Sequence, residues 1–253
     1  MHVMLKEMKN LMAFLTVIPV GMDQDCLADA ANYMYLFPLV GAFIGLLAGI
    51  FAWLLLKVLD ASIVGILTLG FILLITGLHH TDGLLDFGDG VMYQGPAERK
   101  IEIMHDQQTG AGGLALGFVT ILTTAFCIAQ LNQNLVIQSL IVCEASAKLA
   151  MVLMAWVGRS AHEGMNTCFV NAMHGQHRNI RLIATLFIAF SIALSLLSFV
   201  GFSAIIAGLV AALVIVGISN RHFRGVTGDV FGAGNELARL SSLIAILGVV
   251  RWV

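Results

Sequence analysis

Three aspartates, Asp82, Asp86 and Asp89, stand close together in the segment 78–90. In a helix, their i, i+4, i+7 spacing would place all three carboxylates on one face. Neighbouring negative charges repel one another and are costly to remove from water, so the arrangement predicts a compensating cation. Carboxylate oxygens without cysteine favour Mg²⁺ or Mn²⁺, and we expect a Mg²⁺ site here. The alternative is a solvated loop whose aspartates fill turns and cap helices.

The same segment is rich in glycine, at Gly83, Gly88 and Gly90. Glycine lowers helix propensity, which argues against a regular helix over these residues. Glycine also lets a phosphate group approach the backbone closely. The segment therefore combines candidate metal ligands with candidate phosphate contacts.

A second polar segment, residues 98–113, follows. Glu98, Glu102 and Asp106 recur every four residues, so a helix here could present a further carboxylate to a shared site. Gly110 and Gly113 belong to a glycine-rich run that opens an apolar stretch. The N-terminus of a helix at this point could bind an anion, or the small residues could let two membrane helices pack closely.

A third polar segment, residues 221–236, again combines glycine with acidic and basic residues. Asp229 could complete the metal site. Arg221 and Arg224 could donate paired hydrogen bonds to phosphate oxygens, or they could anchor the chain at lipid headgroups. Within an apolar stretch, Glu144 and Lys148 are spaced i, i+4, so they either neutralise each other or face a polar cavity.

The amino-acid composition indicates the kind of protein in which these polar residues are placed. Of the 253 residues, 59% are hydrophobic and only 11% are charged, and the mean hydropathy is +0.93. Soluble domains average roughly 25% charged residues, so much of the apolar surface must face a lipid bilayer. The net charge of −2 leaves no basic excess for a nucleic-acid backbone, so nucleic acid is not expected as a partner.

Apolar stretches of about 20 residues predict transmembrane helices. We expect an all-α, polytopic membrane protein that forms a single domain over residues 1–253, and a homo-oligomeric assembly stays open. Residues 4–17 show helical amphipathic spacing, which predicts a helix in the membrane interface or packed beside the bundle. About seven spans are predicted, at residues 34–57, 61–78, 112–130, 135–157, 181–200, 202–219 and 237–253.

The connections between these spans alternate between short ones and long polar ones. The long connections, 79–111, 158–180 and 220–236, would therefore share one side of the membrane. Counting Lys and Arg, two lie on the other side, Lys57 and Arg251, and ten lie on this side: Lys6, Lys9, Arg99, Lys100, Arg159, Arg178, Arg181, Arg221, Arg224 and Arg239. The positive-inside rule then predicts that the candidate site faces the cytoplasm. We expect a multi-pass protein of the plasma membrane.

Three motifs, in order along nearly the whole chain, resemble the adenosylcobinamide-GDP ribazoletransferase (cobalamin synthase) family. They are His80-x-Asp82-Gly83-x-x-Asp86-x-x-Asp89-Gly90, Met104-x-Asp106-x-x-x-Gly110-x-x-Gly113 and Gly225-x-Thr227-Gly228-Asp229-x-x-Gly232-Ala233-x-x-Glu236. The chain departs from the expected pattern at the doubled His79-His80 and at Gln107-Gln108.

The resemblance implies a late step of cobalamin biosynthesis. Adenosylcobinamide-GDP would be joined to α-ribazole or its 5′-phosphate with release of GMP, and Mg²⁺ would be required. The implied catalytic set is His80 with the five aspartates that are also the implied metal ligands: Asp82, Asp86, Asp89, Asp106 and Asp229. The implied substrate contacts are Gly83, Gly90, Gly110, Gly113, Arg221, Arg224, Thr227, Gly228, Asn235 and Glu236.

Two other classes of function remain open from the residues. Another Mg²⁺-dependent membrane transferase that acts on a diphosphate, of the CDP-alcohol phosphotransferase or prenyltransferase type, also uses aspartates at i, i+4 spacing, but the fuller signatures of those enzymes are not met. A cation or metabolite transporter would need ionisable residues near the middle of its spans. Here the carboxylates cluster at one face, and of them only Glu144 lies deep.

Overall fold

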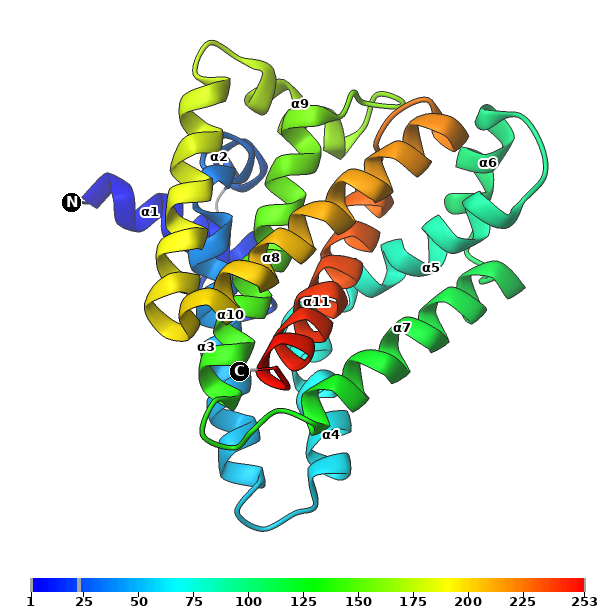
Figure 1. Cartoon of the computed structure of the whole chain (residues 1–253). Coiled ribbons are helices and arrows are strands. Elements are labelled where there is room, and N and C mark those ends of the chain that lie inside the picture. Colours follow the sequence, from blue (N-terminus) through cyan, green and yellow to red (C-terminus); the bar gives the residue numbers. More distant parts are fainter. Residues whose placement is uncertain (1, 22–23, 253) are drawn as a thin grey trace.

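The computed structural model describes residues 2–21 and 24–252, and throughout this part of the chain the regular structure is helical. Figure 1 shows the arrangement of the helices. The elements are α1 (His2–Leu15), α2 (Cys26–Asn32), the 3₁₀ helix η1 (Met34–Leu36), α3 (Phe37–Leu55), α4 (Ala61–Ile75), α5 (His79–Met92), α6 (Ala97–Met104), α7 (Ala111–Ala129), α8 (Val136–Val157), α9 (Met165–His174), α10 (Arg178–Phe223) and α11 (Gly228–Val250). The predicted all-α, polytopic class is confirmed.

The count of seven spans is not confirmed. Among the described residues, five helical segments are long and apolar enough to cross a membrane, or six if α4 and α5 together form one broken span. These two helices meet at an angle of 96°, where Gly77 and Leu78 both have positive φ. Alone, the 15 residues of α4 would extend only about 22 Å at 1.5 Å per residue, which is short of a bilayer core.

The number of predicted spans also differs from the number of long helices at α10. The sequence predicts two spans here, whereas a single 46-residue helix is assigned, with non-helical backbone angles at Ser198. The rings of Phe190 and Phe202 lie 5.5 Å apart, although twelve residues of straight helix would separate them by about 18 Å. The chain therefore folds back at Ser198 and forms two arms, as the yellow and orange ribbon of Figure 1 shows.

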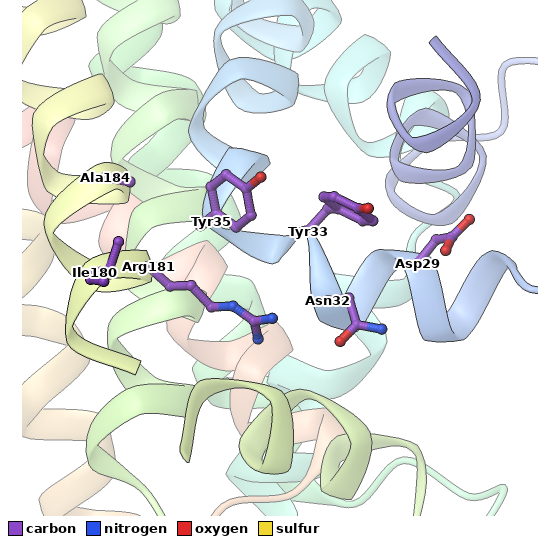
Figure 2. Close-up of a pocket in the computed structure, with 7 residues that line it drawn as sticks. All are labelled: Asp29, Asn32, Tyr33, Tyr35, Ile180, Arg181 and Ala184. Atoms are coloured by element: carbon purple, nitrogen blue, oxygen red, sulfur yellow. The ribbon is translucent and has the colours of Figure 1, made fainter. Parts of the chain in front are cut away.

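Aromatic and basic side chains lie at both ends of α3, as is typical of the two surfaces of a membrane. At its C-terminal end, the Lys57 ammonium lies 3.4 Å from the centre of the Trp53 ring. At its N-terminal end, Tyr33, Tyr35 and Arg181 of α10 line one pocket, in which Arg181 lies next to Tyr35 (Figure 2). The segment Met34–Leu55 between them has 22 residues and would span about 33 Å, close to the thickness of the hydrocarbon core.

The helix α8 forms the centre of the bundle, packed against α3, α10 and α11. Gly41 and Gly45 of α3 rest directly on the backbone of α8 at Glu144 and Leu140. Small residues at such crossings let membrane helices pack closely. α1 packs against α2 and α3 with Leu11 and Leu15 buried, so of the two predicted placements the structure gives the one beside the bundle.

The two kinds of connection lie at opposite ends of the molecule. In Figure 1 the short connections α3–α4 and α7–α8 point downward, whereas α6, α9 and the α10–α11 turn lie toward the top. One charge does not follow the predicted distribution. Arg239, counted among the residues of the polar side, is fully buried between helices, so it gives no information about orientation.

Candidate active site

Close packing of α5 against α11 brings the polar segments together. A methyl group added at Gly83 would lie 2.8 Å from the Cα atom of Asp229, and one added at Gly232 would lie 2.9 Å from the carbonyl oxygen of His80. Despite its glycines, the segment 79–92 is a regular helix. Thr227 caps the N-terminus of α11, and its hydroxyl accepts a hydrogen bond from the Val230 N–H group at 3.2 Å.

Carboxylates from the two helices then face one another. The half-buried Asp86 experiences the negative charges of Asp229, Asp82 and Asp89, in that order of strength. Within the described residues no Lys or Arg forms an ion pair with Asp82, Asp86 or Asp229. Hard oxygen donors whose charges repel without compensation suit a divalent cation such as Mg²⁺. These carboxylates do not form a complete metal site in the structure. In the described ranges, no three His, Cys, Asp or Glu side chains lie close enough together to hold one metal ion.

Asp89 differs from the other two aspartates of α5. It is buried, and its two carboxylate oxygens accept hydrogen bonds from the Gly110 N–H group at 2.7 Å and the Gly113 N–H group at 2.8 Å. These N–H groups belong to the first turn of α7, whose positive end attracts an anion. The predicted anion site at this helix N-terminus therefore exists, but the anion beside Gly110 and Gly113 is the chain's own Asp89.

A cavity of about 540 Å³ opens beside the facing carboxylates, and we call it the carboxylate cavity. Its polar wall contains His79, His80 and Asp82 of α5, His105 of the α6–α7 turn, and Gly228 and Asp229 of α11. Asp86 lies one turn beyond Asp82 along α5, beside this wall. The apolar part of the lining comes mainly from α1, η1, α3 and α9 and includes Ala13, Phe14, Leu15, Met34, Phe37, Met165 and Phe169.

Histidine is the dominant polar residue of the cavity. His80 is buried, and neither its Nδ1 atom nor the Nε2 atom of His162 has a hydrogen-bond partner among the described residues. The rings of His105 and His162 meet edge to face with centroids 5.3 Å apart. The sequence motifs contain only His80 of these residues. His105 lies next to the predicted ligand Asp106, but no spacing distinguishes it from a surface histidine.

Asp106 does not line the cavity. It lies in the exposed turn after α6, where its Oδ1 atom accepts a hydrogen bond of 3.3 Å from the Gln108 N–H group. Gly90 serves close packing, because a methyl group there would lie 2.6 Å from the Met104 side chain. The structure thus places these two predicted site residues outside the lining of the carboxylate cavity.

Arg221 and Arg224 lie around a separate, smaller pocket of about 290 Å³, which we call the basic pocket. Its lining also includes Lys100 and His222, whose Nζ and Nδ1 atoms are 3.0 Å apart. Arg224 forms an exposed ion pair of 2.7 Å with Glu98. Gly90, which the Lys100 ammonium contacts, follows Asp82 by eight residues along α5, a rise of about 12 Å. The helix α5 therefore connects the two pockets.

Asn235 and Glu236 belong to a buried network between α8 and α11. Arg239 donates to both carboxylate oxygens of Glu144 and to Glu236, and Lys148 donates to the Asn235 side-chain oxygen at 2.6 Å. Two carboxylates and two cations make the network neutral, as burial in a membrane protein requires. The i, i+4 spacing predicted that Glu144 and Lys148 either neutralise each other or face a polar cavity, but the hydrogen-bond partner of Glu144 is Arg239 and that of Lys148 is Asn235.

A third pocket, also of about 540 Å³, lies on the outside of the bundle between α2 and the start of α10. Figure 2 shows Arg181 reaching across it below Tyr35, with Asn32 and Asp29 further along. Asp29 accepts a hydrogen bond of 2.8 Å from Asn10, so this carboxylate already has a partner. The pocket contains no facing carboxylates, and it belongs with the membrane-surface residues rather than with the site.

The sequence profile of the cobalamin-5-phosphate synthase family matches residues 7–247 of the chain. A relative from Methanocella arvoryzae is 36% identical over 99% of this chain and 98% of its own length. Relatives from Methanococcoides burtonii and Thermococcus kodakarensis are 33% and 31% identical over 94% and 97% of this chain, and over 90% and 99% of their own lengths. All three carry the name adenosylcobinamide-GDP ribazoletransferase. No solved structure matches the chain.

Proposed function

The chain belongs to the cobalamin-5-phosphate synthase family, and on this premise we propose that it transfers the corrinoid phosphate of adenosylcobinamide-GDP to α-ribazole or its 5′-phosphate and releases GMP. The observation that carries the proposal is the facing of α5 and α11 across Gly83, which directs Asp82, Asp86 and Asp229 toward one another beside a cavity. Carboxylates without cations, at the edge of a cavity, are suited to a Mg²⁺-dependent reaction of a diphosphate.

The bonds that form and break follow from the substrates. A ribose hydroxyl of the acceptor attacks the phosphorus nearer the corrinoid, a new P–O bond forms, and the bond from that phosphorus to the oxygen bridging to GMP breaks. GMP leaves with the bridging oxygen, and the hydroxyl proton is released. Because a cobalamin 5′-phosphate keeps the 5′-phosphate of its acceptor, the attacking hydroxyl is one other than the 5′-hydroxyl.

We assign Asp82, Asp86 and Asp229 as the ligands of Mg²⁺, which when bound would neutralise charge on the two phosphates. Asp89 holds the N-terminus of α7 against α5 and so fixes the helix that carries two of these ligands. The basic pocket at the other end of α5 would take the phosphate and ribose of the GMP half through Arg221 and Lys100. The reaction would take place at the cytoplasmic face of the plasma membrane.

Turnover by the purified chain tests the proposal. The full-length protein in lipid nanodiscs should convert adenosylcobinamide-GDP and α-ribazole to a new corrinoid product and GMP in equal amounts. Omission of either substrate or of Mg²⁺ should abolish both products. Product from a CDP-alcohol or a prenyl diphosphate, with none from the corrinoid donor, would contradict the assignment and favour another diphosphate transferase.

A further inference from the structure

Three phenylalanines from distant parts of the chain meet in the carboxylate cavity. Phe14 of α1 lies 5.2 Å from Phe169 of α9 and 6.4 Å from Phe37 of α3, measured between ring centroids. Phe37 and Phe169 lie 6.1 Å apart. All three phenylalanines line the same cavity as Asp82 and Asp229, and we call them the aromatic wall. Centroid distances of 4.5–7 Å are typical of interacting aromatic rings.

Most neighbours of the aromatic wall on its own helices are apolar. Ala13, Leu15, Met34, Met151 and Met165 belong to the same lining, and the polar residues of that lining nearest Phe169 in the sequence are Asn166 and His162. Asn166, one turn before Phe169, donates its amide hydrogens to the Ser160 hydroxyl and the Val226 carbonyl group. A purine such as guanine would lose the hydrogen bonds of its polar edge against such a wall, which is costly. An aromatic ring with an apolar edge loses none.

The volume of the cavity, and the presence of both apolar and acidic residues in its lining, limit which ligands could bind there. A volume of about 540 Å³ lies in the usual range for sites that enclose a molecule of drug or nucleoside size, roughly 300–1,000 Å³. A corrinoid nucleotide is several times larger and must bind mainly outside the cavity. A nucleoside would place an aromatic base on one wall and ribose hydroxyls near the carboxylates of the other.

We propose that the aromatic wall is the acceptor subsite, where the benzimidazole ring of α-ribazole lies against Phe14 and Phe169, with the fully buried Phe37 packed behind them, while its ribose faces Asp82 and Asp229. This inference rests on the proposed function and adds to it the place and the specificity of the acceptor. It also gives α1 a part in the site, because Phe14 of that helix lines the cavity.

Leucine variants of the wall test the subsite. Phe169→Leu and Phe14→Leu keep an apolar side chain but remove a ring from separate elements, so the two do not depend on the same local fold. In each we expect the dissociation constant of α-ribazole, measured from the fluorescence of its benzimidazole in the absence of donor, to rise about tenfold. The KM for α-ribazole should rise in parallel, and the KM for adenosylcobinamide-GDP should stay within twofold of the parent value.

Phe71→Leu is the matched control, because Phe71 stacks on Phe51 at 4.5 Å and does not line the cavity. It should bind α-ribazole like the parent. Guanosine at the same concentrations should not displace α-ribazole from the parent. Parent-like α-ribazole affinity in both wall variants, or competition by guanosine, would overturn the subsite while leaving the transferase activity of the parent intact. Absence of corrinoid product from the parent itself would instead overturn the proposed function.

Discussion

Gly83 of α5 lies against the backbone of Asp229 in α11, with no room for a side chain between the two helices: an added methyl group would be 2.8 Å from the Asp229 Cα atom and 2.9 Å from its carbonyl oxygen. Both near atoms belong to the backbone, so the contact cannot relax by a side-chain rotation. This contact sets the separation of the carboxylates that we assign to Mg²⁺.

Replacement of Gly83 by alanine should therefore force α5 away from α11. We expect Gly83→Ala to lose at least tenfold in kcat/KM and to lower the free energy of unfolding by about 1–3 kcal/mol, as overpacking does. Gly70→Ala in α4 is the control, because a methyl group there meets no atom within 4 Å. Turnover and the melting temperature in detergent measure both effects. Full activity of Gly83→Ala would mean that the helix separation does not position the site.

Asparagine variants should separate the roles of Asp86 and Asp89. Asp89→Asn would turn an amide N–H group toward one of the two backbone donors in the first turn of α7, which should cost about 1–3 kcal/mol of stability. Asp86→Asn removes a charge that other carboxylates repel, so its melting temperature should equal or exceed that of the parent while turnover falls. If both variants keep the parent's melting temperature, the capping role of Asp89 is wrong.

The different roles of Asp86 and Asp89 could not be predicted from the sequence. The i, i+4, i+7 spacing correctly predicted a shared helix face for Asp82, Asp86 and Asp89, and the apolar stretches predicted a helical membrane protein. The role of Asp89 depends on a contact with residues more than twenty positions away in α7. No local pattern contains that contact.

The aromatic wall could not be predicted from the sequence either. Phe14, Phe37 and Phe169 are ordinary apolar residues in an apolar chain, and only the packing of α1, α3 and α9 brings their rings together. The broken helix at Ser198 was partly anticipated, because the predicted spans 181–200 and 202–219 meet close to it. Arg239 was misplaced, since its position near the predicted start of a span gave no sign of two buried acidic partners.

The buried network should respond to charge balance more than to any single residue. Glu144→Gln leaves an excess of positive charge between α8 and α11, and Lys148→Met leaves an excess of negative charge. Each should destabilise the protein, by up to about 3–5 kcal/mol for an uncompensated buried charge. The double variant keeps Glu236 paired with Arg239 and is neutral.

A double-mutant cycle measures this coupling through the melting temperatures of the four proteins in one detergent. We expect the double variant to be more stable than either single variant. If the two destabilisations simply add, the charges of Glu144 and Lys148 are independent, and the network is not a balanced unit.

The proposed orientation can be tested by labelling with a membrane-impermeant maleimide on intact cells. Cys168 is exposed in α9, so the background must carry Cys168→Ser. Probe cysteines at Gly95, in the turn after α5, and at Asn132, in the turn after α7, are both exposed. Only Asn132→Cys should react from outside, and Gly95→Cys should react after permeabilisation. The reverse pattern would place the site on the outer surface.

The most direct test of the central claim is the turnover of adenosylcobinamide-GDP and α-ribazole by the parent and by Asp86→Asn, in nanodiscs, over a series of Mg²⁺ concentrations. We predict that the parent forms corrinoid product and GMP only when Mg²⁺ is present. At saturating substrate, Asp86→Asn should be slower by about 10²- to 10³-fold, as for loss of a major electrostatic contribution. Parent-like turnover by Asp86→Asn at low Mg²⁺ would contradict the account.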